Sequence, residues 1–289
     1  MDIEKTAKIL EGCVEKSCQE KTGILYSAGV DSAIIAKIAS KFSDITAYTV
    51  GVEGSPDMTY ALKTAEEIGF EVKPVEINLE GVEKILPQLV KVVDDANPVK
   101  VSVGIPMYFA SKAAKEDDLE VMLCGQGSDE LFGGYWRYIE AYINEGPEKV
   151  EEMMKSDVET ADEDNLNRDR AVCNHNGIEL RVPYVQEEFV DFVEKLPLSE
   201  KVREVQDNEY ECTDEIGGRR FIRKYLVRKL AEYYKLPKDI IHRPKKAAQY
   251  GSSSQKLIDK IARKQGYKQK AADKGRNDYV RYFLEELHK

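Results

Sequence analysis

Cysteine and histidine are scarce in this chain, and they do not cluster. There are five cysteines and three histidines. They are Cys13, Cys18, Cys124, Cys173, Cys212, His175, His242 and His288. No pair of cysteines has the CxxC spacing that is typical of metal or redox sites. This distribution argues against a zinc site and a disulfide framework, and it predicts a protein of the reducing cytoplasm.

Long hydrophobic runs and an excess of positive charge are also lacking. A membrane-spanning helix needs roughly 18 apolar residues in succession, and the apolar runs here are only as long as strands. The N-terminal segment MDIEKTAKIL is amphipathic and acidic, unlike a signal peptide. The chain carries 43 Lys and Arg against 53 Asp and Glu, a net charge of −10. This balance argues against nucleic acid or a membrane as partner, although it allows a local basic pocket.

The first half of the chain alternates two kinds of apolar pattern. Strands are predicted at 23–27, 45–52, 70–78 and 119–125, and helices at 32–42, 56–68, 82–93 and 105–115. Strands separated by helices of this length predict a parallel sheet covered by helices on both faces. Such sheets bind ligands at the carboxyl ends of their strands.

The pattern changes after about residue 136. Helical patterns dominate there, at 148–155, 165–174, 185–195, 219–234 and 278–287, and no strong strand run remains. Residues 198–218 and 265–277 are polar and predict loops or lids. We therefore predict an α/β fold in one domain, residues 1–289, with an α/β core at 1–136 and a mainly helical part at 137–289.

The first motif follows the first predicted strand and enters a helix. It reads Ser27, Ala28, Gly29, Val30, Asp31 and Ser32. A strand–turn–helix of this kind points backbone N–H groups and the positive end of a helix dipole at one place, which predicts an anion site. Asp31 would repel a bare phosphate, so we interpret it as a ligand of Mg²⁺ that bridges phosphates. An ordinary turn with a capped helix is the alternative, and a Walker-type loop is absent.

The second motif follows the strand LEVMLC. It begins Gly125, Gln126, Gly127, Ser128 and Asp129 and continues ELFGGY. Four glycines and two carboxylates at the end of a strand indicate a tight loop. Asp129 is the second candidate Mg²⁺ ligand, because its strand ends at the same edge of the sheet as that of Asp31. A glycine-rich capping turn is the alternative.

Two further segments are weaker when taken alone. Glu179 and Arg181 stand on one side of the segment IELRVPY, where a surface ion pair explains them equally well. The segment HRPKKAAQYGS is basic, and a lysine there could neutralise a phosphate. A solvated run of charge is its alternative interpretation.

Together these segments resemble one family. SAGVDS is similar to the SGGxDS loop of the PP-loop ATP pyrophosphatases, and GQGSDELFGGY is similar to GEGSDELFGGY of asparagine synthetases. Three more segments, SPDMTYALKTAEEIG, GIELRVPYVQEEFVDFVEKLP and KYLVRKLAEYYKLPKDIIHRPKKAAQYG, match the same family in the same order. The chain is identified as a relative of the asparagine synthetase synthetase domain, which implies a PP-loop core of the HUP type.

The resemblance implies a reaction and a set of site residues. ATP would place its pyrophosphate on residues 27–32 and its adenine near the backbone of Val50 and Gly125, in a site extending to Gly127 and Ser128. Asp31 and Asp129 would hold Mg²⁺. A carboxylate, with that of aspartate as one candidate, would be adenylated and then converted to an amide by ammonia or an amine. Lys245 would stabilise the charge of the departing phosphate, and a shift of one place to Lys246 stays open. Basic residues concentrate at 219–229 and 243–246, where the triphosphate is expected.

The main departures from the family concern the source of the amide nitrogen and the residue expected to handle it. Only 22 residues precede the first predicted strand, so we expect a stand-alone form without an N-terminal glutaminase domain. Nitrogen would then come from ammonia, an amine or a separate glutaminase subunit, and a homo-oligomer stays open. Gln126 stands where asparagine synthetases carry Glu, and an amide cannot act as a base. If that position alone blocks asparagine formation, Gln126→Glu should raise activity with aspartate.

Further departures and assignments are smaller. Ala28 replaces a glycine, which is tolerable if its φ is negative. Glu179 and Arg181 match residues that shape the acceptor side of the family's site. Two other functions remain open, a PP-loop enzyme of RNA or nucleobase modification and a subunit that binds ATP without catalysis.

Overall fold

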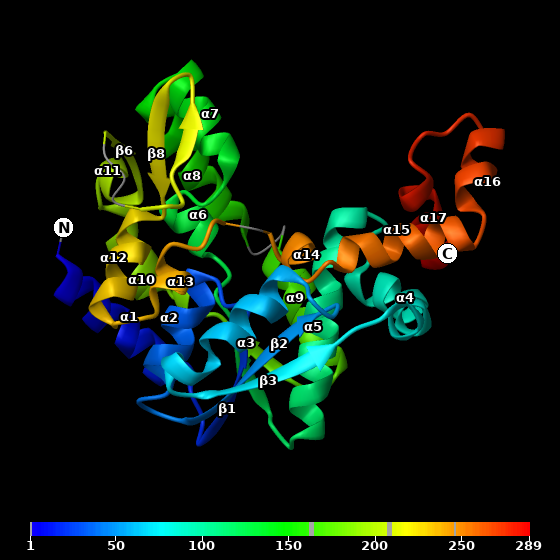
Figure 1. Ribbon diagram of the computed structural model, residues 1–289, viewed down its shortest axis with the longest axis horizontal. Helices are drawn as coiled ribbons and strands as arrows, with labels where there is room; N and C mark the ends of the chain where they lie inside the picture. The colour runs from blue at the N-terminus through cyan, green and yellow to red at the C-terminus, as the bar shows by residue number, and fades with distance from the viewer. Residues whose placement is uncertain (1, 162–164, 207–209, 246) are drawn as a thin grey trace.

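A five-stranded parallel sheet forms the centre of the molecule (Figure 1). This computed structural model describes residues 2–161, 165–206, 210–245 and 247–289. The strand order is β3-β2-β1-β4-β5, and all four pairings are parallel. The strands are β1 (Lys21–Leu25), β2 (Asp44–Gly51), β3 (Glu71–Glu76), β4 (Val121–Leu123) and β5 (Glu179–Arg181). The predicted parallel sheet is confirmed, and it gains β5 as an edge strand.

Two hydrophobic clusters cover the two faces of this sheet. Alternate residues of the strands divide between them: Ile24 and Ala47 belong to one cluster, and Tyr48 and Met122 to the other. The first face is covered by α1 (Ile3–Ser17), α2 (Val30–Ala39), α3 (Pro56–Ile68), α10 (Glu187–Glu194) and α12 (Tyr225–Tyr233). The second cluster contains residues of α4 (Leu79–Val93), α5 (Pro98–Glu116) and α9 (Asn167–His175), and α15 (Ser254–Lys264) and α17 (Tyr279–His288) join it by packing on α4 and α5. The α/β class with helices on both faces is thus confirmed.

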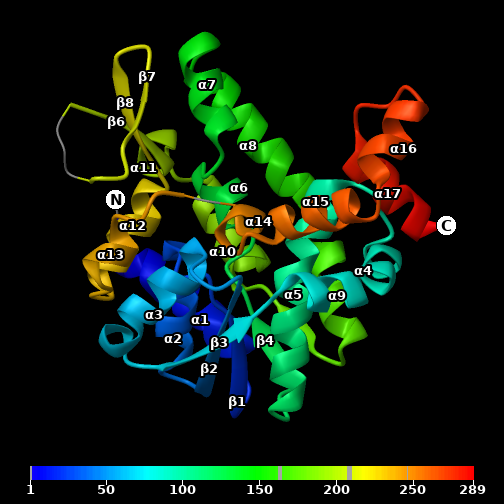
Figure 2. The same ribbon diagram turned by 45° about the vertical axis from the view of Figure 1, so that its right-hand side comes forward.

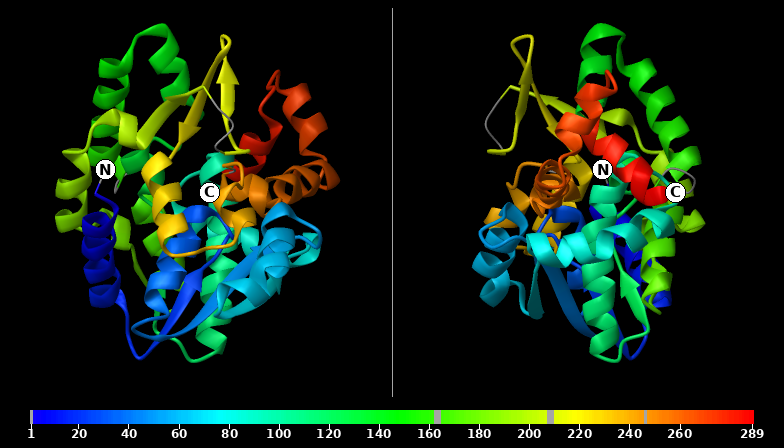
Figure 3. Two further views of the ribbon diagram at one scale, coloured as in Figure 1. Left: turned by 60° about the vertical axis from the view of Figure 1, so that its left-hand side comes forward. Right: turned by 90° about the vertical axis from the view of Figure 1, so that its right-hand side faces the viewer.

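The second half of the chain contains strands that its mainly helical pattern did not predict: besides β5, three strands form a second, antiparallel sheet. Its order is β6-β8-β7, with β6 (Val202–Val205), β7 (Asp214–Ile216) and β8 (Arg219–Arg223). It stands beside α7 (Trp136–Asn144), α8 (Pro147–Ala161) and α11 (Leu198–Lys201), above the main sheet in Figures 1 and 3. The strands have only three to five residues and are rich in charge, so no apolar run marked them.

The remaining elements are short connections. They are α6 (Ser128–Phe132), the 3₁₀ turn Pro183–Val185, α13 (Lys238–Ile241), α14 (Ala248–Gly251) and α16 (Tyr267–Asp273). The last of these lies in the stretch 265–277 that was predicted as a loop, and with α15 and α17 it extends to one side of the molecule (Figure 2). No helix among the described residues is both long and apolar enough to cross a membrane.

The strand order places a ligand site. β1 lies at the middle of the sheet, between β2 and β4. In sheets of this kind, ligands bind beyond the carboxyl ends of the strands, where neighbouring connections leave in opposite directions. The loops that follow β1 and β4 carry the two sequence motifs, so both motifs lie at this edge.

Candidate functional site

The loops after β1 and β4 are in direct contact. A Cβ at Gly125 would lie only 2.9 Å from the backbone nitrogen of Ser32 and 3.0 Å from the Cβ of Asp31. Only glycine allows this approach, because real Cβ atoms do not come so near to backbone. The contact brings the two predicted loops together although about 100 residues separate them.

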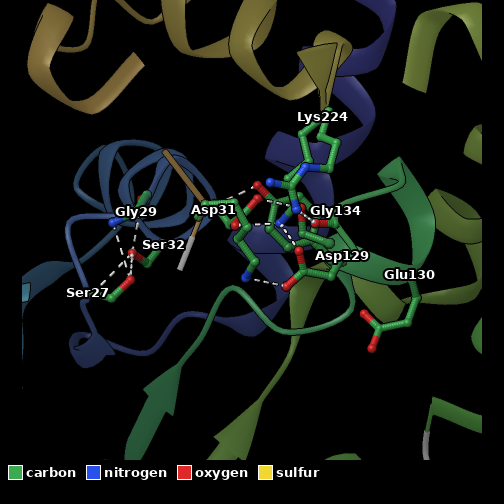
Figure 4. A network of polar contacts seen from close by, with 12 residues as sticks. Ser27, Gly29, Asp31, Ser32, Asp129, Glu130, Gly134 and Lys224 are labelled. Carbon is green, nitrogen blue, oxygen red and sulfur yellow. Dashed lines mark hydrogen bonds and ion pairs between the residues drawn. The ribbon is translucent and has the colours of Figure 1, made fainter. Parts of the chain in front are cut away.

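The loop after β1 is organised by its own hydroxyl groups (Figure 4). The backbone N–H of Gly29 donates to the Ser27 hydroxyl at 3.2 Å, and the Ser32 hydroxyl donates to the Gly29 carbonyl at 3.1 Å. The two hydroxyls are 3.3 Å apart. Helix α2 begins directly afterwards at Val30, and no side chain caps its N-terminus. Uncapped N–H groups and the helix dipole make this end a site that can receive an anion.

Four charged side chains meet in front of this loop. The Lys224 ammonium lies 2.6 Å from Asp31 Oδ2 and 2.8 Å from Asp129 Oδ1, and Lys245 Nζ lies 2.5 Å from Asp129 Oδ2. The Ser128 hydroxyl donates to Asp31 Oδ1 at 2.5 Å. Burial would raise the pKa of Asp129, but Lys224 and Lys245 outweigh it and hold that pKa far below its usual range. Asp129 is therefore a carboxylate at neutral pH in this arrangement.

Lys224 reaches both carboxylates from an unusual backbone position. Its φ is +56°, in the left-handed region, and its side chain is 2% exposed. Gly134 makes room for it, because a Cβ there would lie 1.8 Å from Asp129 Oδ1 and 2.4 Å from Lys224 Cε. Backbone strain and a glycine both serve one contact, which is typical of functional sites.

Arg243 joins the network from the other side. It pairs with Asp57 at 2.6 Å and donates to the carbonyl oxygen of Ser27, and its guanidinium lies over the Tyr60 ring. Arg243 thereby fixes the start of the loop after β1. Sequence reasoning did not single out Lys224, Arg243 or Asp57, although the first two lie within the basic stretches where phosphate was expected.

The site is nearly filled by its own side chains. The cavity between the loops has a volume of about 50 Å³. Its lining residues are Ser27, Gly29, Val30, Asp31, Asp57, Lys224, Arg228, Arg243, Pro244 and Lys245. Ligand pockets are usually ~300 Å³ or more. The phosphates of a nucleotide bound here would compete with the aspartates for the two lysines.

The residues present also fit a divalent cation. The Lys224 ammonium lies 2.6 Å from a carboxylate oxygen of Asp31 and 2.8 Å from one of Asp129. Its position is therefore one that favours a cation. Among the described residues, no group of three or more His, Cys, Asp or Glu could hold a metal ion without further ligands. Mg²⁺ is commonly held by one or two carboxylates together with phosphate oxygens, so the two aspartates suit a cation that arrives with a nucleotide.

Several predicted residues lie apart from this network. Glu179 and Arg181 form a bidentate pair with two contacts of 2.8 Å, and Arg181 also donates to the Ser17 carbonyl at the end of α1. Val50 is buried in β2 within the second hydrophobic cluster. None of the contacts described for these residues reaches the aspartates. The segment after β5 does reach them, through a hydrogen bond from the Tyr184 hydroxyl to the Asp31 carbonyl. Lys246 lies outside the described residues.

From the sequence, Ala28 was expected to be tolerable if its φ is negative, but its φ is +55°. The left-handed region disfavours alanine by roughly 1–2 kcal/mol. Its methyl group is fully buried, which offsets this by about 0.8 kcal/mol. Ala28→Gly should therefore change the free energy of unfolding by less than about 1 kcal/mol, and Ala28→Val should destabilise by more than about 2 kcal/mol. Urea unfolding of both variants tests this, and a well-tolerated Ala28→Val would contradict the backbone assignment.

Comparisons with known proteins agree with this geometry. The fold and the serine-rich loop define an α/β protein of the PP-loop class. The model of the asparagine synthase family matches residues 5–149 and 140–288. The chain belongs to the asparagine synthase family.

Individual relatives match over most of this chain but over less of their own length. A protein of Methanocaldococcus jannaschii, provisionally named a glutamine-hydrolysing asparagine synthetase, is 39% identical over 267 residues, or 87% of this chain and 49% of that protein. The asparagine synthetase of Homo sapiens is 33% identical over 247 residues, or 82% of this chain and 40% of that protein. The chain thus spans about half of these relatives or less. The solved NMN synthetase of Francisella tularensis aligns with all of this chain and 97% of its own, at 15% identity and a TM-score of 0.49, which is too distant to bear on function.

Proposed function

We propose that this protein is an ATP-dependent ligase that adenylates a carboxylate and converts it to an amide, with release of pyrophosphate and AMP. One observation carries the proposal: Asp31, Asp129, Lys224 and Lys245 converge at the carboxyl ends of β1 and β4. Family membership supports it. ATP and Mg²⁺ are the expected cofactors, and this use of ATP supports a cytoplasmic location.

The first half-reaction follows from the charges in the site. A substrate carboxylate oxygen attacks the α-phosphorus of ATP, an O–P bond forms, and the bond between the α-phosphorus and the bridging oxygen breaks. Pyrophosphate leaves with the electron pair. Lys224 and Lys245 can neutralise this leaving group, and the N–H groups at the start of α2 can orient it. Bound Mg²⁺ would supply further charge stabilisation through Asp31 and Asp129.

The second half-reaction takes place on the acyl-adenylate. A nitrogen nucleophile attacks the acyl carbon, AMP leaves, and the nitrogen gives up one proton. We assign Gln126, which is in the same motif as Asp129, to the handling of the nitrogen nucleophile. Ammonia, an amine or ammonia delivered by a glutaminase subunit could supply the nitrogen. Aspartate is the first acid to test, because relatives are named asparagine synthetases.

A panel of carboxylates tests the proposal by ATP–pyrophosphate exchange, which requires only the first half-reaction. We expect one acid, or one narrow class that includes its close analogues, to stimulate exchange in the presence of Mg²⁺. The acid that stimulates exchange should then give AMP and an amide when ammonia is added. If no acid in a broad panel stimulates exchange, the protein is not a ligase of this kind.

A further inference from the structure

Gln126 has a buried acidic partner. Its amide nitrogen Nε2 donates to Asp169 Oδ2 at 2.7 Å. Asp169 lies on α9 and is 0% exposed. Its other oxygen, Oδ1, accepts a hydrogen bond of 2.7 Å from Nε of Arg168, which is also buried. The loop after β4 is thus connected to α9 by a hydrogen bond between residues that are 43 positions apart.

This partner decides which way the amide of Gln126 faces. Because Nε2 of Gln126 donates to Asp169, the NH₂ end of the amide is taken and the carbonyl oxygen Oε1 is left for other contacts. A side chain amide is otherwise free to present either end. Gln126 is half-buried, and it lies between Gly125, which contacts the loop after β1, and Asp129. The end of the amide that remains for other contacts is therefore an uncharged acceptor.

The same partner excludes a carboxylate at position 126. Burial raises the pKa of Asp169, while Arg168 and Gln126 oppose that rise by stabilising its charged form. A glutamate at position 126 would place a second carboxylate within hydrogen-bond distance of the first. Two such groups cannot both be ionised without strong repulsion, so they would share a proton. This changes what we expect of Gln126→Glu, which should be impaired when made alone.

We propose that Asp169 is a positioning residue that fixes the amide of Gln126 with its carbonyl oxygen toward the reacting groups, where it accepts an N–H of the nitrogen nucleophile. The class of nucleophile is a neutral one with at least one N–H to donate, such as ammonia or a primary amine. Gln126 holds it without taking its proton, which passes to solvent. The role in nucleophile binding rests on the proposed function, whereas the fixed orientation of Gln126 does not.

Stability measurements test the orientation without any need for activity. The proteins compared are the wild type, Gln126→Glu, Asp169→Asn and the double variant, unfolded in urea at pH 5 and pH 8. Gln126→Glu should be destabilised, and more so at pH 8, because the shared proton is lost as pH rises. In the double variant, the amide introduced at position 169 can donate to the carboxylate introduced at position 126. Its folding equilibrium constant should therefore exceed the product of the two single effects by at least about tenfold, as expected of one charged hydrogen bond.

A matched control shows whether the coupling is local. Asp117 also accepts hydrogen bonds from two side chains, Tyr48 and Lys73, but it lies at the end of α5. Asp117→Asn combined with Gln126→Glu should show additive effects. Additive effects of Gln126→Glu and Asp169→Asn, or a Gln126→Glu protein as stable as wild type at pH 8, would overturn the proposal.

Enzyme kinetics test whether Gln126 binds the nitrogen nucleophile. In Asp169→Asn, the new amide can donate to Gln126 Oε1, which would turn the NH₂ end of Gln126 toward the reacting groups. The KM for the nitrogen substrate should then rise about tenfold, more than any change in pyrophosphate exchange. An equal loss in both half-reactions would contradict a role in nucleophile binding. Coupling in stability with no exchange in any variant, the wild type included, would support the fixed amide and contradict the proposed ligase.

Discussion

Asp129→Asn should abolish Mg²⁺-dependent pyrophosphate exchange while the protein stays folded. Asparagine keeps the shape of the side chain but loses the charge that both Lys224 and Lys245 pair with. It also removes one of the two carboxylates that suit a divalent cation, so the loss should exceed about 100-fold. Exchange with the stimulating acid, measured over a series of Mg²⁺ concentrations, checks this.

The free energy of unfolding of Asp129→Asn shows whether the loss of exchange activity comes from the site or from unfolding of the protein. In Asp129→Asn, Lys224 still has Asp31 at 2.6 Å, and Lys245 is exposed enough to turn toward solvent. We therefore expect a loss of no more than about 3 kcal/mol in the free energy of unfolding. Asp117→Asn, remote from the site, serves as the control and should keep its exchange activity. Full activity in Asp129→Asn would remove Asp129 from the reaction.

Lys224→Met should produce the largest loss of stability among single changes at the site. It leaves Asp31 and Asp129, with side chains only 15% and 14% exposed, facing each other without the ammonium that separates them. Removal of one partner from a buried ion pair typically destabilises by about 3–5 kcal/mol. Urea unfolding at pH 8 should show a loss in this range, in contrast to Lys149→Met, whose partner Glu152 is exposed.

The dependence of stability on Mg²⁺ and pH shows whether Lys224 acts through its charge. Added Mg²⁺ should recover part of the stability of Lys224→Met and have a smaller effect on the wild type, because the ion can replace the missing charge. One of the two carboxylates in the variant should keep its proton to higher pH than in the unfolded chain. The stability lost should therefore be smaller near pH 5 and grow as pH rises through that titration. A loss that ignores both Mg²⁺ and pH would mean that Lys224 acts through packing alone.

The first half of the fold could be predicted because local signals agree there. Helix α3 runs from Pro56 to Ile68, as predicted, since Ser55-Pro56 starts it and Gly69 ends it with a φ of +80°. Strands buried on both faces gave continuous apolar runs. The antiparallel sheet gave no such signal, because β8 reads RRFIR and only its Phe221 and Ile222 are buried.

The site could be predicted only where topology constrains it. Asp31 and Asp129 were expected to meet because parallel strands end at one edge, and the structure brings them to one ammonium. Lys245 came from the family resemblance and also lies there. Lys224 is 193 positions from Asp31, and Asp169 is on a helix of the second half, so no local pattern connects either to its partner. Both contacts depend on how distant elements pack.

The pairing of two lysines with two aspartates in so small a cavity has a thermodynamic consequence. A nucleotide that takes the lysines leaves the carboxylates without counterions, facing its own negative phosphates. A divalent cation that takes the carboxylates leaves the lysines free for phosphate. Each ligand thus removes an obstacle to the other, and their affinities are linked reciprocally. Either ligand alone would leave charges in the site unpaired, so the side chains themselves favour binding of nucleotide and metal together.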